Sequence, residues 1–390
     1  MALTCSSNSD EETLKRIFII AASMIGLFMA GFALMHSLQS VLPFSLGIDL
    51  VPRWIGTEVM LEGISPYSME ARQKIWQVIY GTDEPQGNVF GFYYPPAITT
   101  ILMPFVITGV SIEIATVAWS ALIWTVWLMA VFIITREKNL ILFTLLAISG
   151  IFFRPAFSNY ILGQNALLSV LAFGFAYILV QDKKWIWAGG LLALSLLKPS
   201  FMILPVIAFL IIYPEIKLWI SCAVILIFLN IPSFFFIGWW IPDFLKEISS
   251  YAFENQVAWS PSIDILTPIG IIWLILAGNL MFFALRSKDW ILLLSALLAL
   301  NAAFTPHTAD YDLVAFLGIL FWLKKYISGW QFLILIWVPW GTLFFFSEIE
   351  TWYQFIWKTY PILLLAFATF IAIKNFYPTL PIKNNLSLIS

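Results

Sequence analysis

The chain has 390 residues, of which 61% are hydrophobic, 17% aromatic and only 11% charged. Globular chains are about 45–50% apolar and about 25% charged, so this composition, with a mean hydropathy of +0.91, excludes a soluble domain and indicates an integral membrane protein. The net charge of -2 argues against nucleic-acid binding, and the two cysteines, Cys5 and Cys222, provide neither a disulfide framework nor a thiolate zinc site.

Apolar segments of helical length recur along the whole chain. At about 20 residues per crossing, they predict an all-α polytopic membrane protein, a single domain over residues 1–390 with about 12 transmembrane helices. The expected segments are 14–35, 112–134, 139–153, 161–181, 185–198, 200–213, 217–237, 263–285, 289–304, 311–323, 330–346 and 356–374.

Basic residues follow the ends of these segments alternately. Because lysine and arginine resist translocation, the face on which most of them fall is predicted to be cytoplasmic, together with both termini. Residues 95–110 would break this alternation if they crossed fully. Their Pro95-Pro96 start and Pro104 favour a re-entrant or interfacial helix on the outer side.

Two long connections are expected outside the membrane. The first, residues 36–94, is rich in Gly, Pro, Trp, Tyr and acids, and the second covers residues 238–262. Long connections without a regular pattern are usually either functional or disordered. Their aromatic content favours ordered structure. We see no internal repeat of the kind that transporter halves show.

Polar residues gather at the outer ends of the expected helices. Charged and amide groups near membrane depth are costly, so they tend to face protein or a wet cavity. We therefore expect a polar cavity that opens outward. The residues are Asp49, Arg53, Glu58, Arg154, Gln164, Asn165, Lys198, His307, Asp310, Tyr311 and Asp312.

Asp49 has two interpretations of equal weight. It is a candidate general base, which needs a carboxylate near the acceptor proton in a dry pocket. It is equally a candidate cap for the helix that Pro52 begins. Gln164 and Asn165, at the start of a helix, are likewise candidate caps.

The cations also have alternatives. Lys198 and Arg154 are candidate snorkelling side chains, but the outer face is poor in positive charge, which favours binding of an anionic phosphate. His307 is either a satisfied loop residue or a hydrogen-bond donor oriented by Asp310 and Asp312. These three residues are a weaker candidate for a magnesium or manganese site, and we expect no metal.

Nucleotide-binding and common hydrolase motifs are missing from the sequence. There is no Walker loop, G-x-S-x-G or H-E-x-x-H. We therefore expect the energy for any reaction to arrive with the substrate.

The order of several short motifs resembles glycosyltransferase family 87. They are Asp49 after the first helix, then 63–67 (GISPY), 93–96 (YYPP), 163–165 (GQN), 197–199 (LKP), and Tyr311-Asp312. The resemblance spans about residues 40–325, although the context of Asp49 and the segment after Tyr326 depart from the family pattern.

The resemblance implies a GT-C-like fold and a polyprenyl-phosphate sugar donor presented at the outer leaflet. It implies that Asp49 is the base and that Tyr94, Gln164, Asn165, Lys198 and His307 line the donor pocket. No cofactor is implied.

The expected function is transfer of a hexose, mannose by the resemblance, from polyprenyl phosphate to a lipid or glycan hydroxyl at the outer face of the plasma membrane. Asp49 would take the acceptor proton and Lys198, Arg154 and His307 would hold the phosphate, with inversion at the anomeric carbon. Arg53, Glu58, Asp310, Tyr311 and Asp312 would support the site or the acceptor. The alternatives are a secondary transporter with an outward-facing polar site and a lipid-binding structural subunit.

Overall fold

The computed structural model describes residues 7–41, 46–84, 90–135, 153–254, 267–304, 310–341 and 350–376, and the single positions 141, 144, 145 and 147. Within this part every regular element is helical. The helices are α1 (Ser7–Val41), η1 (Ile48–Leu50), α2 (Val51–Leu61), α3 (Met69–Tyr80), α4 (Ala97–Ile107), α5 (Ile112–Thr135), α7 (Arg154–Leu162), α8 (Ala166–Gln181), α9 (Trp185–Ser195), α10 (Pro199–Ile212), α11 (Ile216–Ile237), α12 (Ile241–Glu254), α13 (Pro268–Ser287), α14 (Trp290–Phe304), η2 (Asp310–Phe316), α15 (Leu317–Leu323), α16 (Gly329–Gly341) and α18 (Glu350–Phe376).

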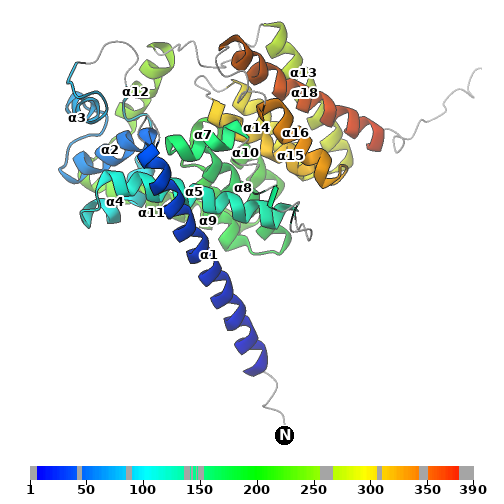
Figure 1. Ribbon diagram of the computed structural model, residues 1–390, viewed down its shortest axis with the longest axis horizontal. Helices are drawn as coiled ribbons and strands as arrows, with labels where there is room; N and C mark the ends of the chain where they lie inside the picture. Colours follow the sequence, from blue (N-terminus) through cyan, green and yellow to red (C-terminus); the bar gives the residue numbers. More distant parts are fainter. Residues whose placement is uncertain are drawn as a thin grey trace, which may run out of the picture.

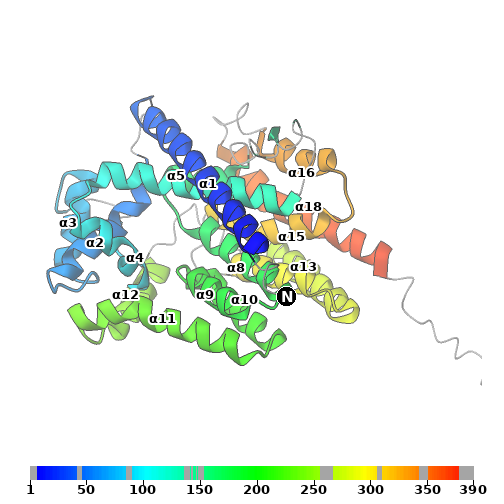
Figure 2. The same ribbon diagram turned by 90° about the horizontal axis from the view of Figure 1, so that it is seen from below.

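The helices form a bundle with two unlike sides. Figures 1 and 2 show α2, α3, α4 and α12 gathered at one side and α13, α16 and α18 at the other. The C-terminal part of helix α1 packs on α5, and its N-terminal part extends away from the bundle (Figure 1). Helix α8 lies between these sides and packs against α9, η2 and α5.

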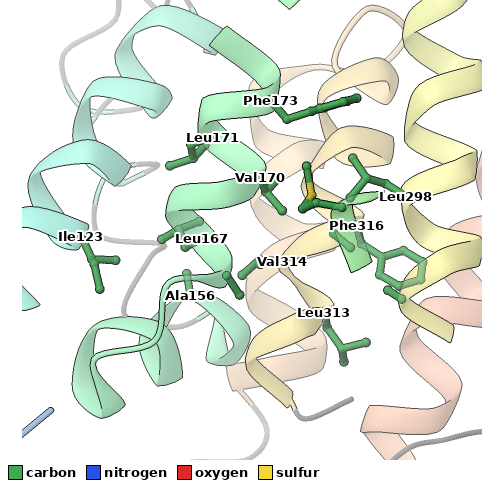
Figure 3. Packing of buried hydrophobic residues seen from close by; sticks show 14 of the residues in the cluster. Ile123, Ala156, Leu167, Val170, Leu171, Phe173, Leu298, Leu313, Val314 and Phe316 are labelled. Atoms are coloured by element: carbon green, nitrogen blue, oxygen red, sulfur yellow. The ribbon is translucent and has the colours of Figure 1, made fainter. Parts of the chain in front are cut away.

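Helix α8 carries the centre of the apolar core. Leu167, Val170 and Phe173 are at most 6% exposed and lie between Ile123 of α5 on one side and the residues of η2 and α14 on the other (Figure 3). Between membrane helices such packing is stabilised by van der Waals contact of well-fitted side chains, because lipid tails are as apolar as the core residues. This packing fixes the start of α8 relative to η2, which matters because both carry expected site residues.

Four helical stretches are long and apolar enough to cross a membrane by themselves. They are Ala21–Gln39, Ile112–Met129, Ile216–Ile237 and Pro268–Ser287, and a fifth span results if the bent pair α7 and α8 counts as one. The described part also contains shorter apolar helices of 10–17 residues. The chain is thus an all-helical multi-pass protein in its described part, and the figure of about 12 crossings stays a prediction.

Several expected helices match the structure closely. Segment 112–134 corresponds to α5 (Ile112–Thr135), and segment 217–237 corresponds to α11 (Ile216–Ile237). Segment 161–181 coincides with α8 (Ala166–Gln181) from the residue after Asn165, which agrees with the expected helix start at Gln164 and Asn165, whereas the short helix α7 before it was not predicted. The chain bends by 115° between Leu162 and Ala166, because Gly163 adopts a left-handed conformation (φ 74°) that ends α7.

The expected connections contain helices. In the segment 36–94, α1 continues through His36 to Val41, and η1, α2 and α3 follow. The segment 95–110 contains α4, which has 11 residues, and 238–262 contains α12, beyond whose end residues 255–266 lie outside the described part. The side of the membrane on which they lie remains a prediction.

Candidate functional site

Two glycine turns bring Asp49 and Gln164 together. The Gly47 amide donates to the Ile161 carbonyl (2.7 Å), and both Gly47 (φ 70°) and Gly163 (φ 74°) are left-handed. A Cβ built on Gly163 would lie 2.9 Å from the Gly47 Cα, closer than real side chains come. Glycine at both positions therefore allows the turn before η1 to lie directly against the turn between α7 and α8.

The carboxylate of Asp49 is held by an amide. Asp49 lies in η1 and is 8% exposed, and the Gln164 Nε2 donates to its Oδ2 (2.8 Å). The residue at the cap position of α2 is Leu50, so the interpretation of Asp49 as the cap residue of that helix was wrong. A buried carboxylate fixed by a side-chain donor is the geometry that a positioned base needs.

Arg53 ties the two turns from within α2. Its side chain is fully buried; Nε and Nη2 donate to the Asp49 carbonyl (3.0 and 2.7 Å), and Nη2 also donates to the Gly163 carbonyl (2.6 Å). The guanidinium carbon lies 4.9 Å from the ring centroid of Tyr94 and 6.0 Å from that of Trp119. Arginine's planar fork suits this task, since it can reach two carbonyls at once.

Tyr94 covers the guanidinium and is itself anchored. Its carbonyl accepts a hydrogen bond from the Tyr67 hydroxyl (2.7 Å). Burial raises the pKa of the Tyr94 hydroxyl, and the nearby charge of Arg53 opposes this shift. The hydroxyl therefore stays protonated at neutral pH and is available as a hydrogen-bond donor.

Lys198 is paired with Asp312. Its ammonium forms a buried ion pair with Asp312, and it lies 4.3 Å from the ring centroid of Tyr311. Burial lowers the pKa of Lys198, and Asp312 opposes the shift; Asp49 and Arg53 are close enough to influence it as well. The sequence predicted these residues individually, but their pairing across 114 positions left no sequence signal.

The buried amide side chains of Asn159 and Asn165 also belong to this region, and only Asn165 was expected from the sequence. Asn159, 0% exposed, donates to the Pro155 (2.8 Å) and Tyr311 (2.9 Å) carbonyls and accepts from the Leu167 amide (2.8 Å), which joins α7, α8 and η2. Sequence analysis missed it and Trp119, although an amide in a mostly apolar segment was a usable signal.

Asn165 connects the start of α8 to the turn before α10. Its Nδ2 donates to the Leu197 carbonyl (3.2 Å), next to Lys198, and α8 has no side-chain cap hydrogen bond. The interpretation of Asn165 as a helix cap was therefore wrong. The Gln164 side chain does not cap α8 either, because it binds Asp49.

The other expected residues lie apart or outside the described part. Arg154 begins α7, roughly 13 Å along the helix from Gly163, and its side chain is exposed. Glu58 accepts a hydrogen bond from the Trp54 indole of its own helix (2.9 Å). His307 and the side chain of Asp310 lie outside the described residues. Among the residues that are described, no group of three or more His, Cys, Asp or Glu could hold a metal ion, and the expectation of no metal stays a prediction.

We call the side chains that converge here the polar cluster. They come from η1, α2, the segment before α4, the turn between α7 and α8, the turn between α9 and α10, and η2. The cluster offers a held carboxylate, two cations and a tyrosine hydroxyl in a largely buried setting, where electrostatic interactions are stronger than in water. Its members are Asp49, Arg53, Tyr94, Gln164, Asn165, Lys198 and Asp312.

Comparison with known proteins assigns the chain to a class. The family model of glycosyltransferase family 87 matches residues 92–323, which is more than half of the chain. The match includes the polar-cluster residues from Tyr94 to Asp312, whereas Asp49 and Arg53 precede it. No curated protein and no solved structure matches the chain. The family is one of membrane glycosyltransferases, so a sugar donor and an acceptor are its substrates, and nothing found favours the transporter alternative. The chain therefore belongs to glycosyltransferase family 87.

Proposed function

We propose that the protein transfers a hexose, mannose by its sequence resemblance, from a polyprenyl phosphate to a hydroxyl group of a lipid or glycan. The observation that carries the proposal is the hydrogen bond of Gln164 to the buried Asp49 carboxylate beside Arg53 and the Lys198–Asp312 pair. The family match supports glycosyl transfer as the reaction class.

Asp49 is the base in this proposal. It takes the proton of the acceptor hydroxyl while that oxygen forms a bond to the anomeric carbon of the sugar. The bond from the anomeric carbon to the phosphate oxygen breaks, and its electron pair leaves with the polyprenyl phosphate. A single displacement of this kind inverts the anomeric configuration and uses no metal ion or other cofactor.

Lys198 is the residue we propose for the leaving phosphate. Its pairing with Asp312 and contact with Tyr311 hold the ammonium in a fixed position before the donor binds. A preorganised cation stabilises charge that develops on the leaving group without reorganisation during the reaction. His307 and Arg154 are proposed as further donor ligands on the basis of the sequence alone, since His307 lies outside the described residues and Arg154 is exposed at the start of α7.

The proposed membrane arrangement follows from the distribution of basic residues. The cluster lies at helix ends that the positive-inside rule assigns to the outer face of the plasma membrane, with both termini cytoplasmic. Cysteine substituted for an exposed residue of α3, such as Gln73, should react with an impermeant reagent added outside intact cells. Labelling only after permeabilisation would contradict this orientation.

The reaction itself is tested with purified protein in detergent. Radiolabelled polyprenyl-phosphate mannose is offered with octyl α-mannoside and with lipid acceptors, and nucleotide sugars serve as the competing donor class. We expect transfer from the lipid phosphate alone, with inverted anomeric configuration in the product. Transfer from a nucleotide sugar instead, or solute uptake in proteoliposomes without any transfer, would overturn the proposal.

A further inference from the structure

The amide orientations of Gln164 and Asn165 are fixed by their partners. Gln164 faces a carboxylate and Asn165 faces a backbone carbonyl, and both of these groups accept hydrogen bonds. The atom that contacts each of them is therefore the amide nitrogen. The oxygen of each side chain consequently points elsewhere.

Neither amide oxygen has a hydrogen-bond partner among the described residues. Gln164 is 3% exposed and Asn165 is 0% exposed, and in the part of the chain that the structure describes neither Gln164 Oε1 nor Asn165 Oδ1 has a hydrogen-bond partner. Buried acceptors are nearly always satisfied in folded proteins, because an unmade hydrogen bond is costly. The Asn165 oxygen therefore needs a donor from a ligand or an ordered water. The Gln164 oxygen needs a donor from one of these or from the Tyr94 hydroxyl, which interacts with the Gln164 side chain.

The Gln164 oxygen lies beside the proposed base. It shares an amide group with the Nε2 that contacts Asp49, so its position is next to the carboxylate. Asn165 Oδ1 shares its amide with the Nδ2 that contacts the Leu197 carbonyl, next to Lys198. The two oxygens thus lie on the sides of the cluster where the sugar and its acceptor would meet the proposed base and cation.

Their chemistry discriminates between parts of the substrate. An ionised phosphate only accepts hydrogen bonds, so it cannot satisfy an amide oxygen, and the neighbouring Asp49 carboxylate repels it. A hydroxyl group donates one hydrogen bond and fits.

We propose that Gln164 Oε1 and Asn165 Oδ1 accept hydrogen bonds from carbohydrate hydroxyl groups and so determine which sugars the protein recognises. This inference rests on the proposed function and deepens it. It separates the cluster into an acceptor-rich part that selects hydroxyl groups, at Gln164 and Asn165, and a cationic part for the phosphate, at Lys198.

The test combines substrate and protein changes in one cycle. Farnesyl phosphate mannose and each of its monodeoxy analogues form the donor series, and octyl α-mannoside with its monodeoxy analogues forms the acceptor series. Each series is measured with the wild type, Gln164→Met and Asn165→Leu, by transfer rate and by ligand-dependent thermal stabilisation. The cycle cancels the general damage that each variant causes.

Asn230→Leu is the matched control. Asn230 lies in α11, donates to the Leu226 carbonyl (2.8 Å) and also has a buried oxygen, Oδ1, without a partner in the described structure. It resembles Asn165 in having its amide nitrogen on a backbone carbonyl and its amide oxygen buried, but the residue as a whole is partly buried and is not part of the polar cluster. The control should keep the full sensitivity to hydroxyl removal.

We expect removal of at least one hydroxyl to weaken kcat/KM or binding of the wild type roughly 10- to 100-fold. For that analogue the penalty should fall to within about threefold in Gln164→Met or Asn165→Leu. The series in which it falls identifies the donor sugar or the acceptor as the source of the hydroxyl.

The inference is overturned if no analogue in either series distinguishes these variants from the wild type, which is the result that an ordered water would give. If the wild type transfers the complete donor but shows no such coupling, the inference fails and the proposed function survives. If the wild type neither binds nor transfers any sugar donor, both fail.

Discussion

Two acid–lysine pairs lie at opposite ends of the segment formed by η2 and α15. Asp312 pairs with Lys198 at one end, where the side chains are 3% and 11% exposed. At the other end the Asp289 Oδ2 lies 3.5 Å from the Lys325 Nζ, and the side chains of Asp289 and Lys325 are 16% and 44% exposed. Asp289 also accepts from the Leu292 amide (3.1 Å) and the Trp322 indole (2.8 Å).

The difference between the pairs separates a structural acid from candidate functional ones. Asp289 caps α14 and anchors α15, so its oxygens serve the fold directly. The polar cluster, by contrast, buries two cations and leaves amide oxygens without partners in the described structure. Burying charge in this way contributes little to stability, which makes a role in substrate binding the better explanation.

Breaking the buried pair should have the largest effect. Lys198→Met leaves Asp312 buried without its cation, and we expect a loss of about 3–5 kcal/mol in stability together with loss of transfer. Thermal unfolding in detergent and the transfer rate measure the two effects.

The double variant Lys198→Met with Asp312→Leu sharpens this test. It should regain most of the stability but not the transfer activity, since the uncompensated charge is gone while the proposed phosphate ligand is still missing. Lys325→Met at the exposed pair should change stability by about 1 kcal/mol or less. Equal effects of the Lys198 and Lys325 variants would contradict the distinction.

The contact between the glycine turns should be the next most sensitive feature. In Gly163→Ala the new Cβ meets the Gly47 Cα at 2.9 Å in a left-handed conformation, so we expect a loss of about 1–3 kcal/mol and a lower transfer rate as Gln164 moves away from Asp49.

Gly174→Ala provides the control for that prediction. Gly174 lies in α8, and a Cβ added there has no neighbour within 4 Å, so alanine should be neutral or stabilise the helix by up to about 1 kcal/mol. If both glycine variants behave alike, the close approach of the two turns does not matter for the site.

The fork of Arg53 should show a smaller, more specific effect. Arg53→Lys keeps the charge but cannot reach the Asp49 and Gly163 carbonyls in one plane. We expect kcat to fall roughly tenfold, with KM little changed, because Nε and Nη2 of Arg53 hold the backbone on both sides of the proposed base. A change confined to KM would instead indicate direct substrate contact.

The structural acid should give the smallest effect on activity. Asp289→Asn keeps an oxygen for the Leu292 amide or the Trp322 indole, so stability should change by about 1 kcal/mol and the transfer rate of the folded protein should not change. A loss of transfer without unfolding would place function at both ends of the segment.

The sequence predicted the parts of the fold that depend on local pattern. Long apolar runs located α5 and α11 to within one residue, because the apolar composition of a spanning helix is continuous along the chain. The short helix α7 (Arg154–Leu162) and its 115° bend from α8 were not predicted, since the bend depends on the conformation of Gly163.

The site was predictable in composition but not in connectivity. The cost of polar groups in a membrane protein singled out Asp49, Gln164 and Lys198. Their partners depend on how distant segments pack: Gln164 binds Asp49 across 115 positions and Arg53 binds Gly163 across 110. Local capping rules suggested helix caps for Asp49 and Asn165, and tertiary contacts overrode them.

The most direct test of the account is single-turnover transfer from polyprenyl-phosphate mannose by the wild type and by Asp49→Asn, with thermal unfolding measured in parallel. If Asp49 is the base, the variant should stay folded and transfer about 10²- to 10⁴-fold more slowly. A folded Asp49→Asn protein that transfers within about threefold of the wild-type rate would contradict the assignment of Asp49 as the base.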